Sequence, residues 1–188
     1  MLVLIVLLGT VAGSMTVLFA RLGAQSAEAM RTREALALAQ SLLDEVLMMP
    51  MTFCDPQDTR AATATRAALG ATGCASTVEG LGPEAGETRY NPANRFDNVS
   101  DYHNLTLPGP GCAGGICDLA GNLLNGPTTT LAGCNARVTL APLALPGVAA
   151  LDGDGRPQAL RIVVTLRCPG RADTALDGVR LRHSPGQV

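Results

Sequence analysis

Residues 1–49 form the longest stretch of the chain without proline and read MLVLIVLLGTVAGSMTVLFARLGAQSAEAMRTREALALAQSLLDEVLMM. The first twenty residues carry no ionisable side chain, and as a helix they would be about 30 Å long, which is the thickness of a hydrocarbon core. They therefore predict a transmembrane helix over residues 1–20. A cleaved signal peptide is the main alternative, but it would begin with a basic segment and have a shorter apolar stretch.

Helical patterning continues past the apolar stretch without a turn signal. Over residues 21–49, apolar side chains recur at helical spacing with polar residues between them, which predicts an amphipathic second half of the same helix. Proline disfavours a helical conformation in the residue before it, so we expect the helix to end before Pro50. The larger apolar side chains of this half are predicted to form a helix–sheet core: Leu36, Leu43, Val46 and Leu47.

Two glycines lie on the apolar half of the helix. Gly9 and Gly13 are four residues apart, a spacing that lets two helix backbones approach closely in lipid. Glycine is also common in membrane helices for other reasons. The pair is therefore a candidate packing face for a neighbouring helix, in the membrane or in a filament.

The composition of the 188 residues excludes some classes of function. The 14 basic residues are all arginine, they are scattered along the chain, and they are balanced by 16 acidic residues. Only five aromatic residues are present. Nucleic-acid binding uses clustered positive charge and aromatic stacking, so we expect no nucleic-acid partner.

We divide the chain into a transmembrane half-helix (1–20), an amphipathic half-helix (21–49), an irregular αβ-loop region (50–128) and an antiparallel β-sheet region (129–188).

Charges and cysteines make opposite predictions about topology. Basic residues follow the apolar span at Arg21, Arg31 and Arg33, which by the positive-inside rule would keep the C-terminal part in the cytoplasm. All six cysteines lie after the helix, in a region rich in glycine and proline, which is typical of a domain oxidised outside the cytoplasm. We favour the topology that the cysteines indicate, with the C-terminal part outside the cytoplasm, and we expect a charged leader upstream of Met1.

Six cysteines allow fifteen pairings. Residues 129–140 and 159–168 are rich in β-branched and aliphatic residues and flank a turn-forming segment at 151–155, which predicts a hairpin. Such a hairpin would bring Cys134 opposite Cys168. Cys54 and Cys74 flank a loop rich in alanine and threonine, and Cys112 and Cys117 bracket a short flexible loop, so we expect each of these pairs to close locally.

No constellation of catalytic residues stands out. The cysteine spacing matches neither a zinc site nor a redox motif, and His103 and His183 are isolated. The acidic segment 152–155 lacks the later glutamate of an EF-hand loop and is interpreted as a turn. The segment 96–102 is open to a calcium or ligand site, although capping of the loop by its polar side chains is simpler. We expect no enzyme, no cofactor and no metal centre.

These patterns predict an α+β fold in which the amphipathic half-helix packs on an antiparallel sheet of three to five strands. Strands are expected at 129–140, 159–168 and 175–183. Because successive side chains of a strand point to opposite faces, Val138, Leu140, Ile162 and Val164 should meet the helix. The segment 104–128, with its glycine and proline clusters, is predicted to be a loop-rich surface for subunit-specific contacts.

The chain resembles type IV pilin-like proteins, and among them the minor pilins of mannose-sensitive haemagglutinin (MSHA) pili. The resemblance rests on four stretches: AQSLLDEV at 39–46, FCDP at 53–56, GPEAGETR at 82–89 and FDNVSDY at 96–102. It implies a prepilin with a basic leader, which is cleaved before an apolar helix carrying an early glutamate. The first acidic residue here is Glu28, so neither feature can be assigned to a residue of this sequence.

As a function, the resemblance implies a structural minor pilin that is stored in the bacterial inner membrane as a single-pass protein with a periplasmic C-terminal domain. From there it would enter a cell-surface pilus and support adhesion or pilus biogenesis. Its expected partners are major and minor pilins, the assembly machinery and membrane lipid. A pseudopilin of type II secretion, or an anchored extracytoplasmic binding domain that does not polymerise, remains the alternative.

Overall fold

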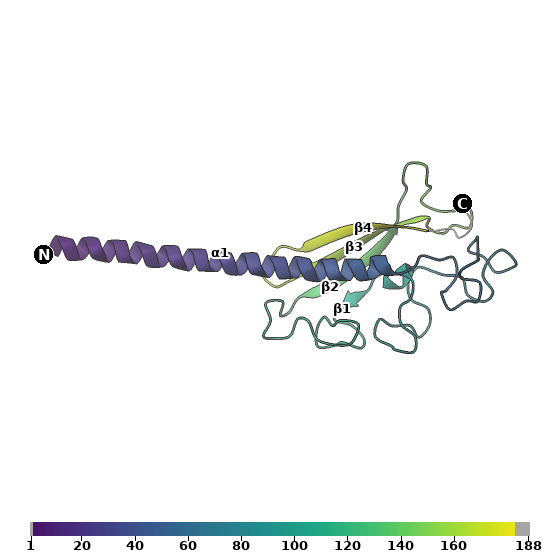
Figure 1. Cartoon of the computed structure of the whole chain (residues 1–188), viewed down its shortest axis with the longest axis horizontal. Helices are drawn as coiled ribbons and strands as arrows, with labels where there is room; N and C mark the ends of the chain where they lie inside the picture. The colour runs from purple at the N-terminus through teal and green to yellow at the C-terminus, as the bar shows by residue number, and fades with distance from the viewer. Residues whose placement is uncertain (1, 183–188) are drawn as a thin grey trace.

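The computed structural model describes residues 2–182, and one helix dominates it (Figure 1). Helix α1 runs from Leu2 to Met48 without interruption. Its last turn closes through a hydrogen bond from the Met49 N–H to the Val46 carbonyl at 3.2 Å, and Pro50 follows. The predicted single long helix is therefore present, and it ends one residue before the expected position.

The rest of the regular structure is a small antiparallel sheet. It contains β1 (Thr106–Leu107), β2 (Asn135–Pro142), β3 (Ala159–Arg167) and β4 (Thr174–Leu181), in the order β1-β2-β3-β4. Between α1 and the sheet, a short 3-10 helix, η1, spans Val99–Tyr102. The α+β class is thus confirmed, with a four-stranded sheet. The last predicted strand and the predicted sheet region extend to positions 183–188, which lie outside the described residues.

The C-terminal part of α1 packs across the sheet, mainly on β3 and β4 (Figure 1). The core joins Leu42, Leu43 and Val46 of the helix to alternating residues of β2 and β3: Val138, Leu140, Ile162 and Val164. Gly178 of β4 lets the helix come close, because a Cβ atom there would lie 3.3 Å from both the Leu43 and the Leu47 Cδ1 atoms. The predicted alternation of the strands therefore matches their buried face.

One predicted core residue is wrong. Leu36 is 45% exposed, whereas Leu43 and Val46 are buried and Leu47 is half-buried against the core. The buried face of the helix is centred near Ala39 and Val46. Since an α-helix turns about 100° per residue, Leu36 lies on the flank of this face, where the sheet does not reach it.

Two strand predictions also need correction. Residues 129–133 form turns rather than the start of β2, with a hydrogen bond from the Cys134 N–H to the Leu131 carbonyl and a positive φ of 72° at Gly133. This turn places Leu131 in the core. In the predicted loop-rich segment 104–128, the two residues of β1 pair with Arg137 and Ala136 of β2. So short a strand has no detectable alternation in the sequence.

All six cysteines form disulfides, and the pairs are those that the sequence favours: Cys54–Cys74, Cys112–Cys117 and Cys134–Cys168. The third pair continues the β2–β3 ladder, in which Asn135 is opposite Arg167. The first two pairs close loops of the region between α1 and β2, which has little regular structure beyond η1 and β1.

Candidate functional site: an exposed rod and its anchor

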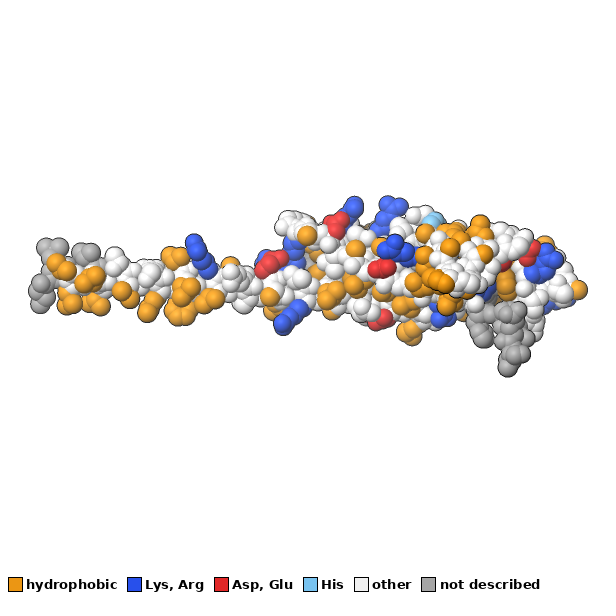
Figure 2. Space-filling model, turned by 90° about the horizontal axis from the view of Figure 1, so that it is seen from above, with side chains coloured by type: hydrophobic (Ala, Val, Ile, Leu, Met, Phe, Trp, Pro, Cys, Tyr) orange, Lys and Arg blue, Asp and Glu red, His pale blue; other side chains and the backbone are white. Residues whose placement is uncertain are grey.

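Residues 3–30 of α1 project away from the domain, except that Glu28 near the base lies 3.9 Å from Arg171, and we call this segment the rod. The large apolar side chains of this segment whose burial the structure describes are exposed on every side of the helix, with Phe19 70% exposed. Figure 2 shows the rod as a thin projection that carries hydrophobic side chains along its length. Its ionisable residues are only Arg21 and Glu28. Helix α1 is long and apolar enough to cross a membrane.

The hydroxyl groups of the rod are satisfied within the helix. Thr10, Ser14 and Thr16 each donate a hydrogen bond to the carbonyl three residues earlier, at 2.8–2.9 Å. A hydroxyl left without a partner would oppose insertion into lipid, because hydrocarbon offers no hydrogen-bonding group. These three hydroxyl groups are therefore compatible with an apolar environment.

Gly9 and Gly13 lie on the rod with nothing within 4 Å of the position where a Cβ atom would stand. Nothing in the described part of this chain packs on them. Their predicted role as a packing face therefore depends on another helix, and it remains a prediction.

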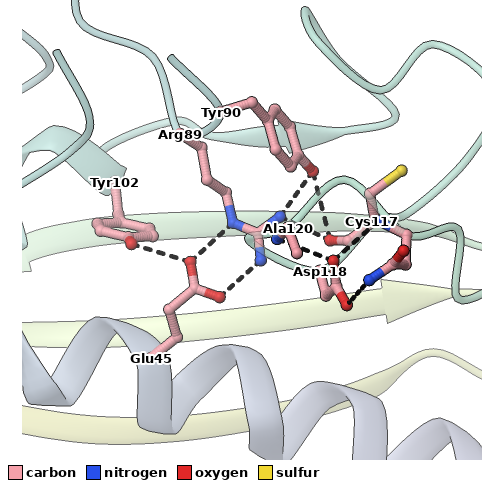
Figure 3. Close-up of polar contacts among 8 residues, drawn as sticks. Glu45, Arg89, Tyr90, Tyr102, Cys117, Asp118 and Ala120 are labelled. Atoms are coloured by element: carbon pink, nitrogen blue, oxygen red, sulfur yellow. Dashed lines mark hydrogen bonds and ion pairs between the residues drawn. The ribbon is translucent and has the colours of Figure 1, made fainter. Parts of the chain in front are cut away.

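A buried charged network fixes the base of the helix to the domain, and we call it the anchor network (Figure 3). The Arg89 guanidinium donates to both carboxylate oxygens of Glu45, at 2.7 and 2.6 Å. Tyr102 donates its hydroxyl proton to Glu45 Oε1 at 2.9 Å. Arg89 Nη1 also donates to the Tyr90 hydroxyl and to the Cys117 carbonyl, at 2.6 and 2.7 Å.

The network is held out of solvent, since the Arg89 and Glu45 side chains are only 5% and 12% exposed. Burial opposes the charge of Arg89, but the hydrogen bonds and the charge of Glu45 outweigh it and raise the pKa of the guanidinium. Burial, followed by the charge of Glu45, raises the pKa of the Tyr102 hydroxyl, which keeps its proton and remains a donor. Three separate chain segments are thereby tied to α1 in one geometry.

Sequence reasoning did not identify this network. A signal was present, because Glu45 lies at helical spacing from the apolar residues Leu42 and Met49 at the edge of the buried face, and a buried charge needs a partner. Each of its three principal residues also lies in a stretch that carries the pilin resemblance: Glu45 in 39–46, Arg89 in 82–89 and Tyr102 in 96–102. Only the tertiary structure brings the three together.

A groove of about 810 Å³ runs beside the network, between α1 and the loop that follows the second disulfide. Its lining combines apolar side chains such as Leu38, Met48 and Leu124 with the carboxylates of Glu45 and Asp118. Hydrogen bonds from the Asn122 side chain and from backbone N–H groups lower the pKa of Asp118. This carboxylate orders its own loop, as Figure 3 shows for Ala120.

The two acidic segments that the sequence left open both cap loops. Asp152 accepts the N–H groups of residues 154 and 156 and pairs with Arg182, while Asp154 pairs with Arg66. In the segment 96–102, Asn98 and Asp101 form a capping box at the start of η1. The turn and capping interpretations are therefore the ones found.

Comparison of the chain with protein-family models, curated proteins and solved structures finds no match.

Proposed function

We propose that this chain is a membrane-anchored structural subunit that assembles through its rod, as a minor pilin of an MSHA-type type IV pilus. The observation that carries the proposal is the rod itself, an apolar helical segment continuous with the domain and exposed on all sides. Such a segment needs a lipid bilayer or neighbouring helices around it.

The energetic argument is simple. Eleven large apolar side chains between Val3 and Met30 are exposed, and their burial is worth roughly 10–20 kcal/mol in total. A bilayer would supply this burial before assembly, and parallel rods of sister subunits would supply it inside a filament. The same helix can therefore serve storage and polymerisation in turn.

The domain supports an extracytoplasmic location. Three disulfides, which use every cysteine of the chain, form and persist in oxidising compartments such as the bacterial periplasm. The rod would then cross the inner membrane, with the domain on the periplasmic side. This arrangement is also the one expected for a pseudopilin of type II secretion.

The anchor network supports a filament role in particular. A buried bidentate ion pair, joined by a tyrosine and a backbone carbonyl, holds the domain rigidly on its own helix. When rods bundle, the orientation of each domain on the filament surface would follow from its helix. The location of this network in the stretches that resemble pilins is the second support for the proposal.

The experiment measures how much of the full chain is in the membrane fraction and how much is in surface filaments when it is expressed in its bacterial host. We expect it in the membrane fraction after alkaline extraction, and also in filaments sheared from the cell surface. Replacing Gly9 and Gly13 together by isoleucine should leave the membrane fraction unchanged and lower the filament fraction, since bulky residues prevent close helix approach. Leu7→Ile and Val11→Ile together, on the opposite side of the same exposed segment, are the matched control.

The possible results separate the alternatives. Full chain that stays in the membrane while filaments form normally would favour an anchored binding domain over a pilin. Incorporation into a secretion pseudopilus instead of a surface pilus would favour the pseudopilin. Full chain that is monodisperse in plain buffer without detergent would contradict membrane storage and filament assembly alike.

A further inference from the structure

Three carboxylates meet in the irregular region, away from the rod, and we call them the acidic corner. Glu79 and Glu84 come from the loop before η1, and Asp101 comes from η1 itself. One carboxylate oxygen of each lies within 4.8 Å of the other two. Three carboxylate oxygens from segments about twenty residues apart in the sequence thus lie close together.

Two of these side chains are held in place by one oxygen and leave the other free. Asp101 Oδ2 accepts the backbone N–H groups of Asp97 and Asn98, at 2.9 and 2.7 Å. Glu79 Oε1 accepts the Ser100 hydroxyl proton at 2.6 Å. The remaining atoms, Glu79 Oε2 and Asp101 Oδ1, are buried and have no hydrogen-bond partner.

Burial makes these unpartnered oxygens costly. Glu79 is 5% exposed and Asp101 is 1% exposed, and a buried charge is normally paired or bound to a metal ion. Among the described residues, no ion pair involves any of the three carboxylates. Arg182 lines the same small pocket as Glu79, but its guanidinium bonds to Asp152.

Arg182 is a cation near Glu79, but the other charged groups around the corner are acidic. Glu87 is buried nearby and accepts the Glu84 N–H through its carboxylate at 3.1 Å. Burial, together with the charges of the neighbouring carboxylates, raises the pKa of Glu79 to about 9 and that of Asp101 to about 7. Without a bound cation, the corner relieves this repulsion only by holding protons.

We propose that Glu79, Glu84 and Asp101 bind a calcium ion. Ligands that are all carboxylate oxygens select hard cations over zinc or copper. Calcium accepts six to eight oxygen ligands in a flexible geometry, whereas magnesium demands a near-ideal octahedron, and the three carboxylates here come from an irregular loop and a short helix. Water and the free oxygens of neighbouring groups would complete the coordination.

The bound ion would join two parts of the fold. It would tie the 79–84 loop to η1, whose last residue, Tyr102, donates to Glu45 in the anchor network. Calcium would thereby stabilise the irregular region where regular secondary structure is sparse, and would hold η1 against the base of α1. This site is separate from the rod, so its test does not depend on filament assembly.

The experiment is a titration of calcium chloride into full chain that has been purified in detergent and treated with a chelator. We expect a Kd below about 1 mM, in the range of extracellular calcium modules. At about ten times the Kd, the Tm should rise by about 3–6 °C. Magnesium chloride at the same concentration should give a smaller rise.

Two variants test the assignment. Glu84→Gln removes a half-buried ligand that lies beside the Glu87 carboxyl, and because the amide keeps a hydrogen-bonding group there, the variant should fold and bind calcium at least about tenfold more weakly. Glu79→Gln keeps an oxygen for Ser100 and should have the same effect. Glu34→Gln on α1 is the control and should leave the Kd within about twofold. A wild-type chain without a calcium-dependent Tm rise, an equal loss of affinity in the control, or stronger binding of magnesium would overturn the proposal.

Discussion

The two parts of helix α1 differ in what surrounds them, although no break in the helix separates them. In the rod, large apolar side chains are exposed on every face. Between Ala35 and Met48, apolar side chains gather on the face that meets the sheet, while Gln40, Ser41 and Asp44 remain exposed. Both parts make the same helical pattern of backbone hydrogen bonds, so they differ in whether their side chains are buried against the rest of the chain.

The comparison teaches that one helix can be built for two environments. The packed part is completed by its own chain, through the core and the anchor network. The rod is incomplete by itself, because its apolar area has no partner in the described chain. Changes to the rod should therefore affect solubility and assembly, whereas changes to the packed part should affect folding.

Removal of the rod gives the largest expected effect. A chain beginning at Ala24 lacks every large exposed apolar side chain of the rod except Met30, and it should remain folded and soluble in plain buffer, because the packed part of α1, the sheet and the three disulfides are all retained. The full chain should require detergent. Size-exclusion chromatography with and without detergent measures the difference. A truncated chain that still aggregates would show that the exposed apolar side chains of the rod are not the reason that the full chain requires detergent.

Loss of the anchor network should come next. Arg89→Ala leaves the Glu45 carboxylate buried without its partner, and we expect the free energy of unfolding to fall by about 3–5 kcal/mol. Denaturant unfolding of the full chain in detergent measures it. Arg161→Ala is the matched control, because Arg161 pairs with Asp177 at a surface where both are more than half exposed, and the change there should be below about 1 kcal/mol. An equal loss of unfolding free energy in the two variants would contradict the idea that burial of the Glu45–Arg89 pair determines its contribution to stability.

Two leucines on the same helix sharpen the comparison further. Leu43→Ala removes a buried side chain that contacts Gly178, and it should lower the free energy of unfolding by about 2–4 kcal/mol. Leu36→Ala removes an exposed side chain and should change it by less than about 0.5 kcal/mol. Thermal unfolding of both variants in the same detergent is sufficient. A large effect at Leu36 would place it in an interface between subunits.

The smallest expected effect is a local response to acid. The backbone N–H groups of Thr77 and Arg60, helped by residues 75 and 76, donate to Asp58 and lower the pKa of its carboxyl below the usual 3.8. The stabilisation is therefore present above about pH 4 and is lost as the pH falls below it. The Thr77 amide signal in NMR should titrate with a midpoint below 3.8, and it should lose this step in Asp58→Asn.

Local chemistry accounts for most of what could be predicted. Helix length followed from the absence of proline before Pro50, the strands from β-branched residues and alternation, and the Cys134–Cys168 pair from the hairpin around residues 151–155. Leu36 was misplaced because its spacing fits an amphipathic face whose width the sequence does not define. The turn at 129–133 was missed because threonine and leucine also favour strands.

The order of residues along the chain was therefore enough to determine one long helix, a small antiparallel sheet and three local or cross-strand disulfides, because each depends on neighbours in sequence or on a single hairpin. The Glu45–Arg89–Tyr102 network and the acidic corner of Glu79, Glu84 and Asp101 were decided only by tertiary structure. Apart from Glu45 of α1, their members come from separate segments of an irregular region, where no periodic pattern fixes which side chains meet. Burial then sets their charge and bonding, and burial is a property of the folded chain alone.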